Sequence, residues 1–344
     1  MRRFNKFGAL AQLVEQWPFK PFVTGSNPVR PKLVIHFVTL TLFCIITNLS
    51  FAAEKQVTIS SKNNIKLTGE LSSSNQNTSA FLIVHGTRGH KGMEIIQTLS
   101  SRLFEEGHDI LSINLSYGFS NRHDDFLACD INHNHNEHES VEEIITWYKY
   151  LIKKGYNQIN FIGHSRGGLN VMQALSIINN KKIKSYLLAP VIDTYKGTKA
   201  YYEKELGIPY DLIINSNENY NLADRYKRIN FLFCENVNVS SKTFKSYLDF
   251  SKNKSAYPFS FNIFDLINNS KSPVTIFSGT EDEILLDSYK SYEEIDKLNV
   301  RTVILNGGGH FFRDLYLEDV IDVIIDSSLF NNKRFIRHTF AIHV

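Results

Sequence analysis

The chain has 344 residues, of which 42% are hydrophobic and 21% are charged, and these are ordinary values for a folded globular protein. Its formal net charge is +3, but residues 1–52 hold an excess of five positive charges, so the remainder carries 3 − 5 = −2. A slightly acidic body gives no electrostatic reason to expect nucleic-acid binding. The composition therefore predicts one large domain or two smaller ones with no nucleic-acid partner, and it leaves the oligomeric state open.

An apolar run precedes the predicted domain. Residues 33–51 form a mostly apolar run that follows two basic residues and leads into the small-x-small pattern Ser50-Phe51-Ala52. This layout predicts a signal peptide over residues 32–52, with cleavage near Ala53. The protein would then be periplasmic or secreted, with no stable membrane span after cleavage. An uncleaved membrane anchor is the alternative, because the run approaches spanning length.

Residues 1–31 do not fit a signal peptide. The stretch AQLVEQWPFKPFVTGSNPV resembles a translated transfer-RNA gene. Our interpretation is a non-native or unstructured leader, with the true translation start further downstream. A genuine leader is the alternative, and in either case residues 1–52 are left out of the fold prediction.

Strand-like and helix-like segments alternate along residues 53–326, which we interpret as one domain. Short apolar runs predict strands at 55–60, 64–71, 80–86, 109–115, 158–164, 185–190, 273–279 and 302–307. Amphipathic spacing predicts helices at 92–107, 141–155, directly after Ser165, and at 286–298 and 314–326. This alternation predicts an α/β fold with a mostly parallel central sheet and helices on both faces.

The alternation fails between about residue 191 and residue 272. This segment is rich in Tyr, Asn and Lys and shows only short, mixed patterns. Its position between two predicted core strands favours a lid insertion over a separate domain. Residues 327–344 form a C-terminal tail with no predicted role.

A candidate nucleophile lies in the sequence Gly163-His164-Ser165-Arg166-Gly167, a G-x-S-x-G pattern. The pattern falls between a predicted strand and a predicted helix, which is the context that a nucleophilic serine requires. The glycines allow two chain segments to approach, and the helix start places N–H groups beside the hydroxyl. A serine in an ordinary glycine-rich turn is the alternative.

A serine hydroxyl needs a base, and an acid and a histidine follow in the expected order. Asp282 comes directly after the strand at 273–279, and His310 comes directly after the strand at 302–307. Because the carboxyl ends of parallel strands share one edge of a sheet, both side chains are expected to lie near Ser165. Glu281 and Asp193 compete with Asp282 for the acid, and His310 has the alternative of an ordinary core or surface histidine.

The loop after the strand at 80–86 is a candidate for half of an oxyanion hole. An oxyanion needs two donors, and the backbone N–H groups of Thr87 and Arg166 are the candidates. We assign His85 to shaping this loop and not to proton transfer. The side chains of Arg88 and Arg166 are expected to form structural ion pairs, with binding of an anionic substrate group as the alternative.

At this point the sequence resembles the α/β-hydrolase superfamily. The resemblance covers about residues 56–326 and rests on FLIVHGTRG, FIGHSRGGLN, SGTEDEI and NGGGH, in that order. It implies Ser165 as nucleophile, Asp282 as acid, His310 as base, and Thr87 and Arg166 as the oxyanion hole. It further implies a serine hydrolase without a cofactor that acts on a small-molecule ester or thioester, and the predicted signal peptide adds that this hydrolase is exported. A peptidase of the same fold and a non-catalytic binding protein remain the alternatives.

The stretch CDINHNHNEHES at 129–140 gathers three histidines and two carboxylates, His133, His135, His138, Glu137 and Glu139. Such a set can ligate zinc. The alternative, which we favour, is a polar loop that leads into the helix at 141–155 with Ser140 as its N-cap and no metal.

Two cysteines remain after the signal peptide, Cys129 and Cys234. In an oxidising compartment the pair permits one disulfide, and two buried free thiols are the alternative.

Overall fold

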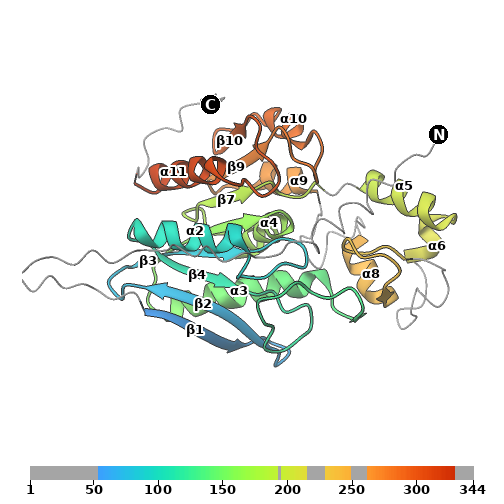
Figure 1. The fold of residues 1–344 in the computed structure, drawn as a ribbon, viewed down its shortest axis with the longest axis horizontal. Coiled ribbons are helices and arrows are strands. Elements are labelled where there is room, and N and C mark those ends of the chain that lie inside the picture. Colours follow the sequence, from blue (N-terminus) through green and yellow to red (C-terminus); the bar gives the residue numbers. More distant parts are fainter. Residues whose placement is uncertain (1–52, 193–194, 215–228, 249–261, 330–344) are drawn as a thin grey trace, which may run out of the picture. The chain divides into compact units, whose positions relative to one another are not determined.

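The computed structural model describes residues 53–192, 195–214, 229–248 and 262–329 (Figure 1). The predicted leader, the predicted signal peptide and most of the predicted tail lie outside these residues. Within the described ranges, the helices are too short or too polar to cross a membrane.

The predicted mostly parallel sheet is confirmed. Its eight strands have the spatial order β1-β2-β4-β3-β6-β7-β9-β10, and only the β1–β2 and β2–β4 pairs are antiparallel. The strands are β1 (Ala53–Ser60), β2 (Lys66–Ser73), β3 (Ser79–Val84), β4 (Asp109–Ile113), β6 (Gln158–His164), β7 (Ser185–Leu188), β9 (Val274–Gly279) and β10 (Val300–Leu305). The central parallel strands β3, β6, β7 and β9 are buried along almost their whole length, because both faces of the sheet are covered.

Helices cover both faces (Figure 1). On one face α2 (Glu94–Glu105) and α11 (Leu315–Leu329) pack together, and on the other lie α3 (Glu137–Lys153), α4 (Arg166–Ile178) and α9 (Ile263–Asn269). The side chains of β3 alternate between the two resulting cores, with Phe81 and Ile83 in the first and Leu82 and Val84 in the second.

Two predicted helices differ from the structure. Helix α3 begins at Glu137, because Asn136 is its N-cap and the Glu139 carboxylate accepts a hydrogen bond from the Asn136 N–H at 3.0 Å. The prediction that Ser140 caps this helix is therefore wrong, since Ser140 lies in its first turn. The helix predicted at 286–298 is shorter in the structure, where it is α10 (Ser288–Glu293). It begins only at Ser288 because Asp287 before it has a left-handed φ of 59°.

The segment between β7 and β9 contains a further core. The elements that form this core are α5 (Tyr195–Leu206), α6 (Tyr210–Ile214), β8 (Asn238–Val239) and α8 (Ser241–Leu248). They share a core rich in aromatic residues, with Tyr202, Tyr210, Phe231, Phe244 and Tyr247 buried in it. Strand β8 pairs in parallel with β5 (Asn132–His133), so this segment is joined to the loop that leads into α3.

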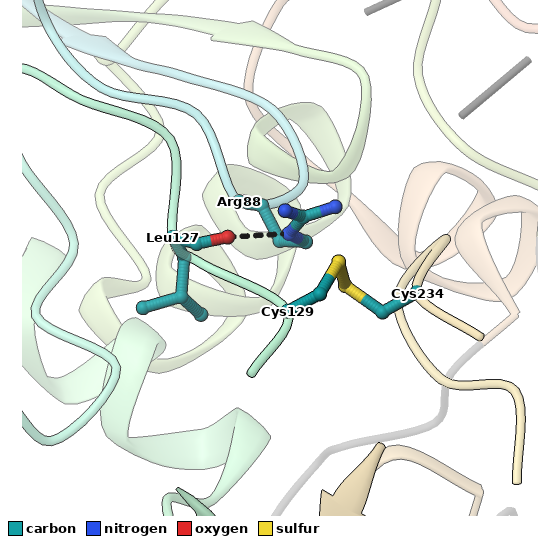
Figure 2. Close-up of a disulfide and its surroundings, with 4 residues drawn as sticks. All are labelled: Arg88, Leu127, Cys129 and Cys234. Carbon is teal, nitrogen blue, oxygen red and sulfur yellow. Dashed lines mark hydrogen bonds between the residues drawn. A yellow bond between two sulfur atoms is a disulfide. The ribbon is translucent and has the colours of Figure 1, made fainter. Parts of the chain in front are cut away.

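A disulfide makes a second connection at the same place. Cys129 and Cys234 are bonded, with 5.4 Å between their Cα atoms (Figure 2), which is the first of the two alternatives that the sequence left open. The two residues are 105 positions apart. Closing a loop of this length restricts the unfolded chain and typically stabilises a folded protein by about 2–4 kcal/mol.

Candidate active site

Ser165 lies at the sharp turn between β6 and α4. Its backbone has φ 53° and ψ −121°, a conformation that a residue with a Cβ adopts only under strain. The flanking glycines permit this turn: a Cβ on Gly163 would lie 2.6 Å from the Gly167 carbonyl oxygen, and one on Gly167 would lie 2.4 Å from the His85 carbonyl oxygen. The sequence therefore needs glycine at both positions to bring β6, α4 and the end of β3 together.

Asp282 and His310 lie together at the carboxyl ends of β9 and β10. A Cβ on Gly279 would lie 1.9 Å from the Gly308 carbonyl oxygen, so the loops after the two strands pack directly on each other. In this arrangement His310 Nδ1 lies 2.8 Å from Asp282 Oδ2, and both side chains are buried. The competing Glu281 is exposed, and Asp193 lies outside the described residues.

The Asp282 carboxylate is held in its ionised form. Burial alone raises its pKa, but the hydrogen bond with His310 and those from the backbone N–H groups of Leu285 and Ile284 bring the pKa below its usual value. Since the carboxylate accepts, His310 Nδ1 carries the proton and donates. In the neutral imidazole the lone pair is then on Nε2, where it can accept a proton from a nucleophile.

Two residues that the sequence did not indicate hold the backbone of His310. His164 Nε2 donates to the His310 carbonyl oxygen at 3.0 Å, and the His310 N–H donates to Glu283 Oε2 at 3.0 Å. Burial and the neighbouring His310 lower the pKa of His164 to about 3, so His164 is neutral and acts as a hydrogen-bond donor. The only signal for them in the sequence was their position, because His164 directly precedes Ser165 and Glu283 directly follows Asp282.

The structure thus brings His310 to the residue that precedes the candidate nucleophile. The rings of His164 and His310 are 5.0 Å apart between their centroids. Ser165 Oγ makes no hydrogen bond to any described residue. Hydrogen bonds between a nucleophile and its base are often long before substrate binds and shorten in the complex, so this geometry is compatible with a Ser165–His310 pair.

The loop predicted to form an oxyanion hole lies against Ser165. A Cβ on Gly86 would be 3.0 Å from the Ser165 Cβ. Thr87 follows in a turn closed by a hydrogen bond from the Gly89 N–H to the Gly86 carbonyl oxygen at 3.1 Å, and its own N–H donates to no described residue. Arg166 is the first residue of α4, where the helix carries positive partial charge.

His85 and the two arginines make structural contacts. His85 Nδ1 donates to the Gly86 carbonyl oxygen at 2.8 Å, and its Nε2 accepts from the Leu115 N–H at 3.0 Å, so both ring nitrogens are bonded to backbone. Arg166 lies 3.4 Å from the buried Glu137 carboxylate. Arg88 Nε donates to the Leu127 carbonyl oxygen at 2.7 Å.

The histidines of the 129–140 stretch pack into the protein. His133 and His135 are buried with ring centroids 5.7 Å apart, and His135 Nε2 is 3.0 Å from the Tyr247 hydroxyl. His138 lies in the first turn of α3. In the described part of the chain, no three His, Cys, Asp or Glu side chains are grouped so that they could hold a metal ion.

His133 predicts a pH-dependent stability, because neither of its buried ring nitrogens has a partner within the described residues. Burial, followed by the positive charge of Arg88, lowers its pKa to about 4. Between a pH of about 6.5 and about 4 the unfolded chain binds a proton at this residue and the folded chain does not, so stability falls as the pH falls, by up to about 1.4 kcal/mol per pH unit. The free energy of unfolding of His133→Phe lacks this pH dependence. We therefore expect the difference in this free energy, variant minus wild type, to be about 2 kcal/mol larger at about pH 5 than at about pH 8.

Urea unfolding of both proteins at the two pH values measures this difference. His123→Phe, at an exposed histidine, is the matched control. An equal difference between wild type and His133→Phe at both pH values would show that His133 does not couple protonation to unfolding.

Comparison with known proteins shows which class of fold this is. No protein-family model and no curated protein matches the sequence. Solved structures do match. Est1E from Butyrivibrio proteoclasticus has a TM-score of 0.55 at 18% identity over 80% of this chain and 97% of its own. The esterase domain of a Rhodothermus marinus protein has a TM-score of 0.52 at 14% identity over 80% and 98%.

The Pyrococcus furiosus esterase Pf2001 is similar over a larger share of this chain, with a TM-score of 0.51 at 16% identity over 88% of this chain and 97% of its own. The chain therefore has the fold of the α/β-hydrolase superfamily, as its motifs predict.

Proposed function

We propose that the protein is a serine hydrolase that cleaves a carboxylic ester or thioester through an acyl-enzyme on Ser165. The observation that carries this proposal is the buried Asp282–His310 hydrogen bond of 2.8 Å, together with the bond between His310 and His164, the residue before the strained Ser165. A neutral imidazole with its lone pair on Nε2 is the base that a serine hydroxyl requires. The esterases among the similar structures share the fold and support a reaction of this class.

In the proposed reaction His310 Nε2 takes the Ser165 proton while Ser165 Oγ attacks the acyl carbon. The Asp282 carboxylate stabilises the imidazolium cation, and the backbone N–H groups of Thr87 and Arg166 stabilise the oxyanion. His310 then gives the proton to the leaving alcohol or thiol. Water activated by His310 releases the acyl group in the second half of the reaction.

A panel of substrates tests the proposal. Nitrophenyl esters of increasing acyl length, a thioester, a ferulate ester and aminoacyl anilides would be incubated with the purified protein. The ferulate ester is included because Est1E has been solved with ferulic acid bound. We expect ester or thioester turnover that stops after treatment with a fluorophosphonate, whereas turnover of anilides alone would assign the site to a peptidase.

We infer that the segment between β7 and β9 acts as a lid that sets substrate choice. The Arg166 guanidinium lies over the ring of Tyr247 at 5.5 Å, so α8 contacts the residue that directly follows Ser165. Tyr247→Leu is therefore expected to change the preferred acyl length in the same panel. An unchanged preference would separate this segment from substrate choice.

We also infer that the protein is exported. The Cys129–Cys234 disulfide supports this, because such bonds persist in oxidising compartments. N-terminal sequencing of exported protein is expected to begin near Ala53. A mature chain that still contains residues 1–31 would contradict both the signal peptide and the downstream start.

A further inference from the structure

The turn at Gly86–Gly89 has an unusual residue at its third position. Arg88 has φ 58°, in the left-handed region, and the turn is closed by the Gly89 N–H at 3.1 Å from the Gly86 carbonyl oxygen. A turn of this kind normally has Gly or Asn at this position, because a Cβ makes the conformation unfavourable. Other contacts must therefore stabilise Arg88 in the turn that carries Thr87.

These contacts are hydrogen bonds to the backbone N–H, the backbone carbonyl oxygen and the side chain of Arg88. The Arg88 N–H donates to the Tyr117 hydroxyl at 3.0 Å. The Leu127 N–H donates to the Arg88 carbonyl oxygen at 2.9 Å, and Arg88 Nε donates to the Leu127 carbonyl oxygen at 2.7 Å (Figure 2). All three bonds come from one stretch of chain, residues 117–127.

Tyr117 itself has a left-handed conformation, with φ 49°, four residues after the end of β4. Its side chain is 5% exposed, and its ring lies edge-on to His135 and under the Arg122 guanidinium at 5.2 Å. Burial raises the pKa of the phenol, so the hydroxyl stays neutral and its oxygen accepts from Arg88. Strained residues of this kind persist where surrounding contacts determine them, often at functional sites.

The stretch that holds the turn is itself anchored. Arg122 Nη2 donates to the Gly89 carbonyl oxygen at 2.7 Å, and its Nη1 donates to the Leu115 carbonyl oxygen at 2.7 Å. Cys129, two residues after Leu127, is bonded to Cys234 (Figure 2). The position of the turn therefore depends on contacts with residues 117–127, which lie outside the turn itself.

We propose that Tyr117 and Arg88 are positioning residues of the oxyanion hole, which hold the strained turn so that the Thr87 N–H faces the oxyanion. This inference rests on the proposed function. A missing oxyanion donor typically reduces turnover by about 10²–10³-fold. A donor that remains but is less firmly held should reduce turnover by less, on the order of tenfold, and the loss should appear in kcat because the ground-state carbonyl needs the donor less.

Tyr117→Phe tests the inference by removing one oxygen atom and keeping the ring. We expect kcat to fall on the order of tenfold with KM nearly unchanged. Affinity for a trifluoromethyl ketone, which forms a tetrahedral oxyanion on Ser165, should fall by a similar factor. Tyr156→Phe is the matched control, because its hydroxyl donates to Asp109 Oδ2 at 2.6 Å at the opposite edge of the sheet. The control is expected to lower the unfolding temperature and to keep kcat and ketone affinity.

Arg88→Gly and Arg88→Ala form a second, independent test. Both variants lose the bond to the Leu127 carbonyl oxygen, but glycine adopts a left-handed φ readily and alanine does not. Arg88→Ala is therefore expected to lose more kcat and more ketone affinity than Arg88→Gly. This comparison still applies if Tyr117→Phe fails to fold.

Two outcomes are distinguishable. If Ser165→Ala abolishes turnover but Tyr117→Phe keeps wild-type kcat and ketone affinity, or Arg88→Ala matches Arg88→Gly, the positioning role is overturned and the proposed function stands. If Ser165→Ala keeps wild-type turnover, the proposed function itself fails, and the positioning role fails with it.

Discussion

Ser165→Ala is expected to reduce ester turnover by about 10⁶-fold, as in serine hydrolases whose triad residues act as a unit. The reason is that Ser165 carries the hydroxyl group of the β6–α4 turn. This turn packs against the Thr87 loop, and its residue His164 is bonded to His310. His310→Ala should cost about as much, because losses within one unit do not add. Hydrolysis of a short-chain nitrophenyl ester, followed at saturating substrate, measures both.

A control measurement must show that the Ser165→Ala protein is folded. Ser165 Oγ makes no hydrogen bond to a described residue, so the far-ultraviolet circular dichroism and the urea midpoint of Ser165→Ala should match wild type. A folded Ser165→Ala protein that retains wild-type turnover would remove this serine from the mechanism.

Asp282→Asn is expected to reduce turnover by about 10⁴-fold, because it reverses the tautomer of His310. Asp282 Oδ1 accepts from the N–H groups of Ile284 at 2.9 Å and Leu285 at 2.6 Å. In the variant the amide oxygen must stay with these two donors, which turns the amide NH₂ toward His310 Nδ1. Nδ1 must then accept, the ring proton moves to Nε2, and the base can no longer take the proton of Ser165.

The matched control is Glu281→Gln at the exposed neighbouring carboxylate, which should retain wild-type turnover. A crystal structure of Asp282→Asn should keep the 2.8 Å contact to His310, which would separate a wrong tautomer from a displaced ring. Wild-type activity in a folded Asp282→Asn would assign the acid to another residue.

The sequence predicted the sheet and the order of the candidate site residues for a clear physical reason. Strands that are buried on both faces, such as β6 and β9, are short and rich in apolar residues. Their ends are marked by Gly163 and Gly279, which permit close packing there. Because parallel strands share an edge, residues placed directly after them were expected to meet. Asp282 and His310, which are 28 positions apart, do meet in the structure.

The remaining features depend on approaches between distant segments, and these leave no local pattern. His164 bonds to the backbone of His310, 146 positions away, and Tyr117 bonds to Arg88 across 29 positions. The β5–β8 pair is two residues long on each side, too short for any periodicity. Asn136 was missed as an N-cap because Ser140, four residues on, has an equally favourable side chain for that position.

The most direct test of the central claim is to locate the covalent adduct of a fluorophosphonate by mass spectrometry of the digested protein. We expect one adduct per chain, on Ser165, formed rapidly in wild type, slowly in Asp282→Asn and not at all in Ser165→Ala. An adduct on a different residue, or none in a preparation that hydrolyses esters, would contradict the claim that Ser165 is the nucleophile.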